Sequence, residues 1–302
     1  MGLLAILIAY ADIGALRSAL TRVGWRDVLA ATLILIGLTP FQAWRWREIA
    51  RTIGIPLSWR SALIIVMIGT FFNQVLPSAI GGDAARVWLL RNAHVPVAKG
   101  LSSILLDRVV GLLGMVVIVA VGFPWLMQIV RQPVLQTAAA MAVAAGFLGI
   151  ALLLLLDRVP LPGTVRSRAF VGKLLAVATD ARAVFLAPRV IASALLASVL
   201  VLLMVSAAVW ILARGIGLNV GIEVFILLLP LVLLLSLLPV SIAGWGVREG
   251  AMIACLSLVG VDAASAFAVS ALFGLTYVLA GLPGGLVWLL SGSKTRMSDP
   301  SV

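Results

Sequence analysis

The sequence has few of the residues on which soluble enzymes and metal proteins depend. It contains one cysteine, Cys255, one histidine, His94, and only 11% charged residues over 302 positions. A single cysteine excludes an internal disulfide framework, and the usual zinc-ligand sets need further cysteines or histidines. We therefore expect no metal site and no cofactor. No polar stretch is long enough for a soluble catalytic domain, so any chemistry must take place in or beside a bilayer.

The signatures of several enzyme classes are also missing. The chain has no HExxH, no GxSxG, no Walker-type GxxxxGK[ST] and no dinucleotide-binding fingerprint in a suitable context. We therefore expect no enzyme activity. An ATP-driven pump is excluded unless a partner protein supplies the motor.

Apolar residues, by contrast, are abundant. They make up 63% of the chain, against roughly 45–50% in soluble domains, and the mean hydropathy is +1.21. This composition predicts an all-α polytopic membrane protein. The formal net charge of +11 is spread over short loops between apolar segments, which indicates membrane topology rather than binding of nucleic acid.

A spanning helix needs about 20 apolar residues, and the chain offers about six such segments. Residues 1–16 are interpreted as a short first span, because they lack the basic region of a signal peptide. Two shorter apolar segments are each followed by a short second piece. The predicted spans are residues 1–16, Val28–Ala43, Leu101–Trp125, Val134–Leu156, Val190–Ala213 and Ala263–Leu290; the broken segments are Ser61–Leu76 with Asp83–Asn92 and Gly221–Leu238 with Gly246–Leu258.

The two broken segments resemble each other at an offset of 162 positions. Leu76, Pro77, Ile80, Gly82 and Arg86 correspond to Leu238, Pro239, Ile242, Gly244 and Arg248. If the two breaks enter the bilayer as re-entrant hairpins from opposite faces, fifteen basic residues lie inside and six outside, with both termini cytoplasmic. We therefore predict a single transmembrane domain (1–302) with inverted-topology repeat halves at about 28–130 and 190–292. A cytoplasmic amphipathic loop, 157–189, links them.

Charged side chains in this apolar context are the candidate site residues. Asp83 is expected to cap the helix after the first break, and Gly81 and Gly82 to permit positive φ and close approach of the backbone. Arg86 is expected to pair with Asp107 across helices, since Asp107 and its neighbour Arg108 point in different directions. Guanidinium groups suit bidentate capture of phosphate, so the expected ligand is a phosphate-bearing, lipid-like molecule. The full candidate set is Asn73, Gln74, Pro77, Gly81, Gly82, Asp83, Arg86, Asp107, Arg108, Pro239, Gly244, Gly246, Arg248 and Glu249.

Three segments together resemble a known family. "NQVLPSAIGGDAARVWLL", "LDRVVGLLG" and "LPVSIAGWGVREGAMI" are similar to the lysylphosphatidylglycerol synthetase transmembrane-region family, which is related to the flippase part of the multiple peptide resistance factor. The resemblance runs from about residue 20 to 290, and some stand-alone bacterial members are associated with hopanoid biosynthesis. It implies a multi-pass protein of the bacterial inner membrane that moves lipids with anionic or aminoacylated headgroups between leaflets. The soluble aminoacyl-transfer domain is lacking, so the chain is not expected to synthesise lysylphosphatidylglycerol.

Two other functions remain open from the sequence. A small-solute secondary transporter would use the same repeat and could couple to an ion through Asp83, Asp107 or Glu249. A non-catalytic accessory subunit of a membrane lipid (hopanoid or glycolipid) pathway would account for the missing energy-coupling motif. Homo-oligomers and association with a lipid-synthesis enzyme are both compatible with the sequence.

Overall fold

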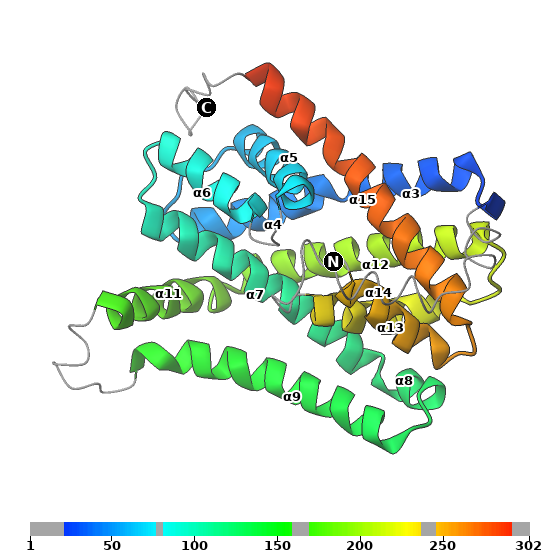
Figure 1. Ribbon diagram of the computed structural model, residues 1–302. Helices are drawn as coiled ribbons and strands as arrows, with labels where there is room; N and C mark the ends of the chain where they lie inside the picture. The colour runs from blue at the N-terminus through cyan, green and yellow to red at the C-terminus, as the bar shows by residue number, and fades with distance from the viewer. Residues whose placement is uncertain (1–20, 77–80, 159–168, 237–245, 292–302) are drawn as a thin grey trace.

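A computed structural model describes residues 21–76, 81–158, 169–236 and 246–291, and every regular element in these ranges is helical. The helices gather into one bundle, with α9 along its outer side (Figure 1). Their bounds are α3 (Trp25–Gly37), α4 (Thr39–Thr52), α5 (Trp59–Val75), α6 (Gly81–Asn92), α7 (Val97–Val121), α8 (Phe123–Ile129), α9 (Pro133–Leu155), η1 (Leu156–Arg158), α11 (Ala169–Phe185), α12 (Pro188–Gly215), α13 (Ile222–Ser236), α14 (Val247–Ser257) and α15 (Ala263–Ser291).

Five helical stretches in the described ranges are long and apolar enough to cross a membrane, so the chain is a polytopic all-α membrane protein. They coincide with the five predicted spans that follow the N-terminal one, and residues 1–16 lie outside the described residues. One boundary was wrong: helix continues from Trp25 to Thr52, well past Ala43. Pro40 did not end it because it occupies the first turn of α4, where the missing N–H of proline costs little.

The first broken segment consists of α5 and α6, which pack against each other. Leu76 ends α5 in an extended conformation (φ −84°, ψ 142°), as the following Pro77 requires. At Gly82 the two helix backbones nearly touch, because a Cβ there would lie 2.1 Å from the carbonyl oxygen of Gly69. The expected close approach is confirmed, whereas the expected positive φ is absent: Gly81 and Gly82 are helical.

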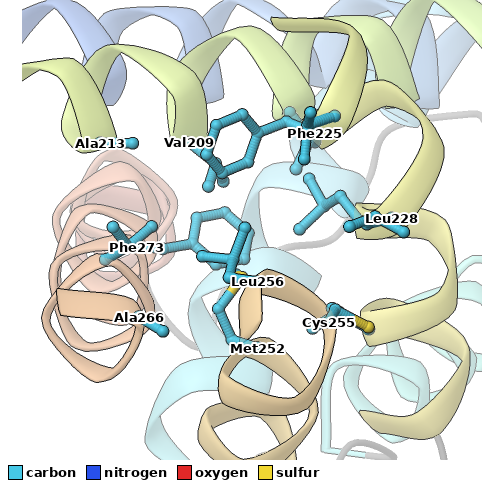
Figure 2. Close-up of a cluster of buried hydrophobic side chains, with 14 of the residues drawn as sticks. Val209, Ala213, Phe225, Leu228, Met252, Cys255, Leu256, Ala266 and Phe273 are labelled. Atoms are coloured by element: carbon cyan, nitrogen blue, oxygen red, sulfur yellow. The ribbon is translucent and has the colours of Figure 1, made fainter. Parts of the chain in front are cut away.

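The second broken segment consists of α13 and α14. Gly246, the N-cap residue directly before α14, has φ +92°, a left-handed conformation that favours glycine. The two helices pack against α12 and α15 through apolar side chains. Figure 2 shows Val209 of α12, Phe225 of α13, Met252 of α14 and Phe273 of α15 around a common centre. This core also includes side chains from the first half of the chain, among them Leu35 of α3 and Val119 of α7.

Helix α15 contacts both broken segments. Its C-terminal half lies on α5, where a Cβ on Gly284 would come within 1.9 Å of the carbonyl oxygen of Met67. Its N-terminal half lies on α14, with Ser270 and Phe273 next to Arg248. This one long helix therefore connects the two halves (Figure 1).

The predicted amphipathic segment contains helix α11, which packs on the bundle. Asp180 is buried and accepts hydrogen bonds from Lys99 Nζ and Ser102 Oγ of α7, each at 2.7 Å. Ala178, Ala181 and Val184 form the buried face around it. The loop is thus a docked helix, while its place on the cytoplasmic side stays a prediction.

Candidate functional site

Five charged side chains from three helices meet inside the bundle; we call them the arginine–aspartate cluster (Arg45, Asp83, Arg86, Asp107 and Arg108). Asp107 Oδ1 accepts from Arg45 Nε at 2.7 Å, and its Oδ2 accepts from both terminal nitrogens of Arg86 at 3.3 Å. Asp83 Oδ2 accepts from Arg108 Nε at 2.5 Å, and its Oδ1 lies 3.8 Å from Arg86 Nη1. Each carboxylate therefore bridges two guanidinium groups.

Neighbouring side chains hold these arginines in place. The guanidinium carbon of Arg86 lies 4.1 Å from the centroid of the Trp46 ring, and Trp46 Nε1 donates to Ser103 Oγ at 3.2 Å. Arg45 Nη1 donates to Ser198 Oγ of α12 at 3.1 Å. Stacking and directed hydrogen bonds fix the planes of the guanidinium groups, which bidentate recognition of an anion requires.

The charges of the cluster do not balance. Among these five side chains, three guanidinium groups and two carboxylates leave a formal excess of one positive charge; Arg86 and Asp107 expose only 11% and 6% of their side chains, and Arg108 exposes 35%. The Nε–H of Arg86 is buried and has no hydrogen-bond partner within the described part of the chain. A buried excess charge is costly unless a counter-charge is present. The cluster is therefore suited to binding an anion.

Two adjoining cavities surround the cluster. The smaller, about 190 Å³, is lined by all five cluster residues together with Gln42, Thr70 and Asn73. The larger, about 520 Å³, shares Gln42, Arg45 and Arg108 with it and extends along mainly apolar side chains of α7, α12 and α13. A polar chamber thus adjoins an apolar groove, with Ser236 and Tyr277 among the few polar groups in the groove.

The structure confirms one predicted pairing and shows where the other candidate residues lie. Arg86 pairs with Asp107 as expected, and Arg108 turns away from its neighbour to pair with Asp83. Asp83 was expected to cap the helix after the break, which is wrong: α6 already begins at Gly81, so Asp83 lies inside its first turn and points at arginines.

The remaining candidate residues of the first break lie in different surroundings. Asn73 lines the smaller cavity, and its Oδ1 accepts from the backbone N–H of Gly82 at 2.9 Å. Gln74 faces Gly281 of α15 and is absent from the lining of that cavity. Pro77, and in the second break Pro239 and Gly244, lie outside the described residues.

At the second break the structure shows a smaller group, the Arg248–Glu249 pair. Arg248 Nη2 donates to Glu249 Oε1 at 2.7 Å, and Ser270 Oγ donates to the same oxygen at 3.2 Å. Glu249 Oε2 accepts from the backbone N–H of Gly246. Glu249 thus pairs with an arginine, which is its own neighbour in the sequence. The pair is formally neutral, and α15 contributes both Ser270 and the ring of Phe273 next to it.

Sequence reasoning missed Arg45, Gln42 and Ser198. Arg45 lies just past Ala43, where the predicted span ends, in a stretch that contains several other arginines. The signal was the spacing of Thr39, Ala43, Trp46 and Ala50, which are buried on one face of α4. This period is helical, and it shows that the helix, with Arg45 on it, continues through the basic stretch.

Comparisons with known proteins agree with this architecture. The model of the family described as lysylphosphatidylglycerol synthase TM region matches residues 1–285. A segment of 105 residues is 26% identical to an Archaeoglobus fulgidus protein named UPF0104 membrane protein, and it covers 35% of this chain and 32% of that relative. The match thus spans about a third of either protein. Because the family model covers nearly all of its length, the chain belongs to the lysylphosphatidylglycerol synthase transmembrane-region family, a membrane family related to lipid flippase domains.

Proposed function

We propose that this protein moves phospholipids between the leaflets of the bacterial inner membrane and does so without enzyme chemistry. The observation that carries the proposal is the arginine–aspartate cluster, whose formal excess of one positive charge lines a polar cavity beside an apolar groove. A phospholipid has the matching parts, an anionic phosphate and an acyl chain. The membership of a family related to flippase domains supports the same conclusion.

The formal charge of the cluster favours one class of lipid headgroup as its ligand. A phosphodiester carries one negative charge, which balances the excess positive charge. A diphosphate would bring further negative charge into a site where the carboxylate of Asp107 is already buried and that of Asp83 exposes 14%, and uncompensated buried charge is costly. The proposed ligand is therefore a phosphodiester lipid, held by the guanidinium groups of Arg86 and Arg45 through charge-assisted hydrogen bonds.

The neighbouring groove favours a lipid over a small polar solute. The smaller cavity, about 190 Å³, has room for a headgroup phosphate, and the adjoining 520 Å³ is lined mainly by Leu, Val and Met side chains. An apolar groove adds affinity for an acyl chain through burial of apolar surface. It adds none for a small hydrophilic ion.

The proposal includes the inverted repeat and the orientation inferred from the sequence. Helices α4 to α7 and α12 to α15 pack in the same order: in each set the first helix contacts the second and fourth, and the third contacts the second and fourth. Equivalent halves that enter from opposite faces would let one site open alternately to either leaflet. Cytoplasmic termini follow from the distribution of basic residues.

Reconstitution into vesicles tests the proposal. Vesicles carry tail-labelled phosphatidylglycerol in the inner leaflet, and its appearance in the outer leaflet is followed by quenching from outside. We expect the wild type to speed exchange, and Arg86→Gln, which removes the excess charge, to abolish most of it. Arg60→Gln, on an exposed arginine at the start of α5, is the matched control and should transport normally.

Two outcomes would contradict the proposal. One is exchange no faster than in protein-free vesicles for labelled phosphatidylglycerol, phosphatidylethanolamine and phosphatidylcholine alike. The other is normal exchange by a folded Arg86→Gln protein, which would remove the cluster from the transport path.

A further inference from the structure

A third cavity, of about 570 Å³, lies far from the arginine–aspartate cluster, between the ends of α7 and α8 and the start of α13. Val121 in its wall comes thirteen residues after Arg108 on α7, which corresponds to about 20 Å along the helix. Most of the wall is apolar, including Val117, Ile118, Val121, Val224 and Leu227. Two polar side chains, Glu223 and Gln128, complete it together with Trp125.

Glu223 differs from every other acidic side chain in the described part of the molecule. The described ranges contain eight other acidic side chains: six form ion pairs, and Asp27 and Asp262 accept hydrogen bonds from backbone N–H groups. Glu223 makes neither kind of contact within the described ranges. No lysine or arginine lines this cavity in the same ranges. The wall therefore carries a carboxylate without a protein counter-charge.

Glu223 lies in the first turn of α13, at the positive end of the helix dipole. Trp125, which lines the same cavity, exposes 60% of its surface, and exposed tryptophans are typical of the membrane interface, where lipid headgroups lie. An anionic group next to an apolar cavity at headgroup level is complementary to a lipid whose headgroup bears a cation.

We propose that this cavity is a binding site for an ethanolamine-type phospholipid. The primary ammonium group donates to the carboxylate of Glu223, the amide of Gln128 donates to a phosphate oxygen, and one acyl chain covers Val117, Val121 and Leu227. A choline headgroup has no N–H to donate, and an anionic glycerol headgroup is repelled by the carboxylate. This site is separate from the proposed transport site and does not depend on it.

Native mass spectrometry of the purified full chain tests the site. The protein is incubated in detergent with equal amounts of phosphatidylethanolamine, phosphatidylglycerol and phosphatidylcholine of identical acyl chains, and the retained lipid is counted. We expect about a fivefold preference for phosphatidylethanolamine, the ratio that corresponds to ~1 kcal/mol for one ion pair near the surface. Glu223→Gln should reduce the preference to about one. Val121→Trp, which fills the cavity, should reduce the amount of lipid retained.

The matched control is Asp262→Asn, which removes an exposed carboxylate that is absent from this cavity wall. It should keep the preference, and melting temperatures show that all variants are folded. Equal retention of the three lipids by the wild type, or an unchanged preference in Glu223→Gln, would overturn the proposal. A loss of preference that is the same in Asp262→Asn would also overturn it, because general surface charge would then be the cause.

Discussion

The two broken segments share residues in sequence but differ in what surrounds their arginines. At the first, Arg86 belongs to a group of five charges from three helices that lines a cavity and carries a formal excess of one positive charge. At the second, Arg248 is neutralised by Glu249, and Ser270 donates to the same carboxylate oxygen as Arg248. Similar motifs thus belong to a cavity-lining cluster with excess positive charge in one half and to a formally neutral pair in the other.

The difference teaches that an arginine in a membrane helix must be judged by its whole charge environment. Arg248 exposes 10% of its side chain and Arg86 11%, so burial does not separate them. The two arginines differ instead in the number and source of their carboxylate partners. Arg86 shares Asp107 with Arg45, whereas Arg248 has Glu249 from its own helix. The following predictions test this contrast, from the largest expected effect to the smallest.

Double substitutions should recover stability at the second break and fail to do so at the first. Glu249→Leu alone strands a buried arginine and should cost about 3–5 kcal/mol, whereas Arg248→Met with Glu249→Leu replaces a neutral pair by apolar groups and should recover most of the loss. Asp107→Leu should lower the free energy of unfolding by about as much as Glu249→Leu does. Adding Arg86→Met should recover little, since Arg45 also depends on Asp107.

Melting temperatures in detergent measure these effects. Asp157→Ala, which breaks the more exposed pair with Arg182, is the control and should cost about 0–1 kcal/mol. Equal recovery in the two double variants would show that the clusters are energetically alike and that the contrast is wrong.

Two glycines compare how tightly the helices of the two broken segments are packed. Gly82→Ala places a methyl group 2.1 Å from the carbonyl oxygen of Gly69 and should destabilise the protein by about 1–3 kcal/mol, because α5 and α6 must separate. Gly250→Ala meets no atom within 4 Å and should stabilise α14 by about 0.5–1 kcal/mol through helix propensity. Opposite shifts of melting temperature are expected. A tolerated Gly82→Ala would mean that the α5–α6 contact is looser than the structure shows.

Conservative substitution of the arginines separates binding from charge. Arg86→Lys keeps the charge but loses the planar fork, and lipid exchange in vesicles should fall about tenfold, equivalent to ~1.4 kcal/mol, while the protein still folds. Arg248→Lys should affect exchange less, because Arg248 serves a neutral pair. If both lysine variants lose exchange equally, the two arginines hold the headgroup in turn from the two leaflets, and the two halves are equivalent in function.

The smallest effect is expected at an exposed carboxylate before α15. Asp262 accepts from the backbone N–H of Ser265 at 2.9 Å, and this hydrogen bond holds the pKa of Asp262 below its ordinary value. A lowered folded-state pKa means that the stabilisation is present above the unfolded pKa and is lost as the pH falls through the folded value. Asp262→Ala should cost about 1 kcal/mol at pH 7, and less in acid. A difference between the two melting temperatures that does not shrink on acidification would contradict this role.

Much of the fold followed from the sequence because long apolar segments in a membrane have few alternatives to helix. The Arg86–Asp107 pair could also be predicted, since isolated charges in apolar helices must find partners. Arg45 could not be found by that rule, because it stands in a basic stretch that is typical of loops. The cavities, and the lack of a partner for Glu223 among the described residues, depend on which helix faces meet, and this is a property of packing that no local pattern contains.

The place of α15 in the chain has a consequence for biosynthesis. A ribosome makes the other described helices first, so α5 is inserted before Gly284 is available to pack against it, and Glu249 before Ser270 is available to donate to it. Until α15 has been synthesised and inserted, neither half has its full set of contacts. Completion of both halves is therefore a late, post-insertion event, and a chain truncated before Ala263 would lack the shared partner of both and should be a substrate for membrane proteases.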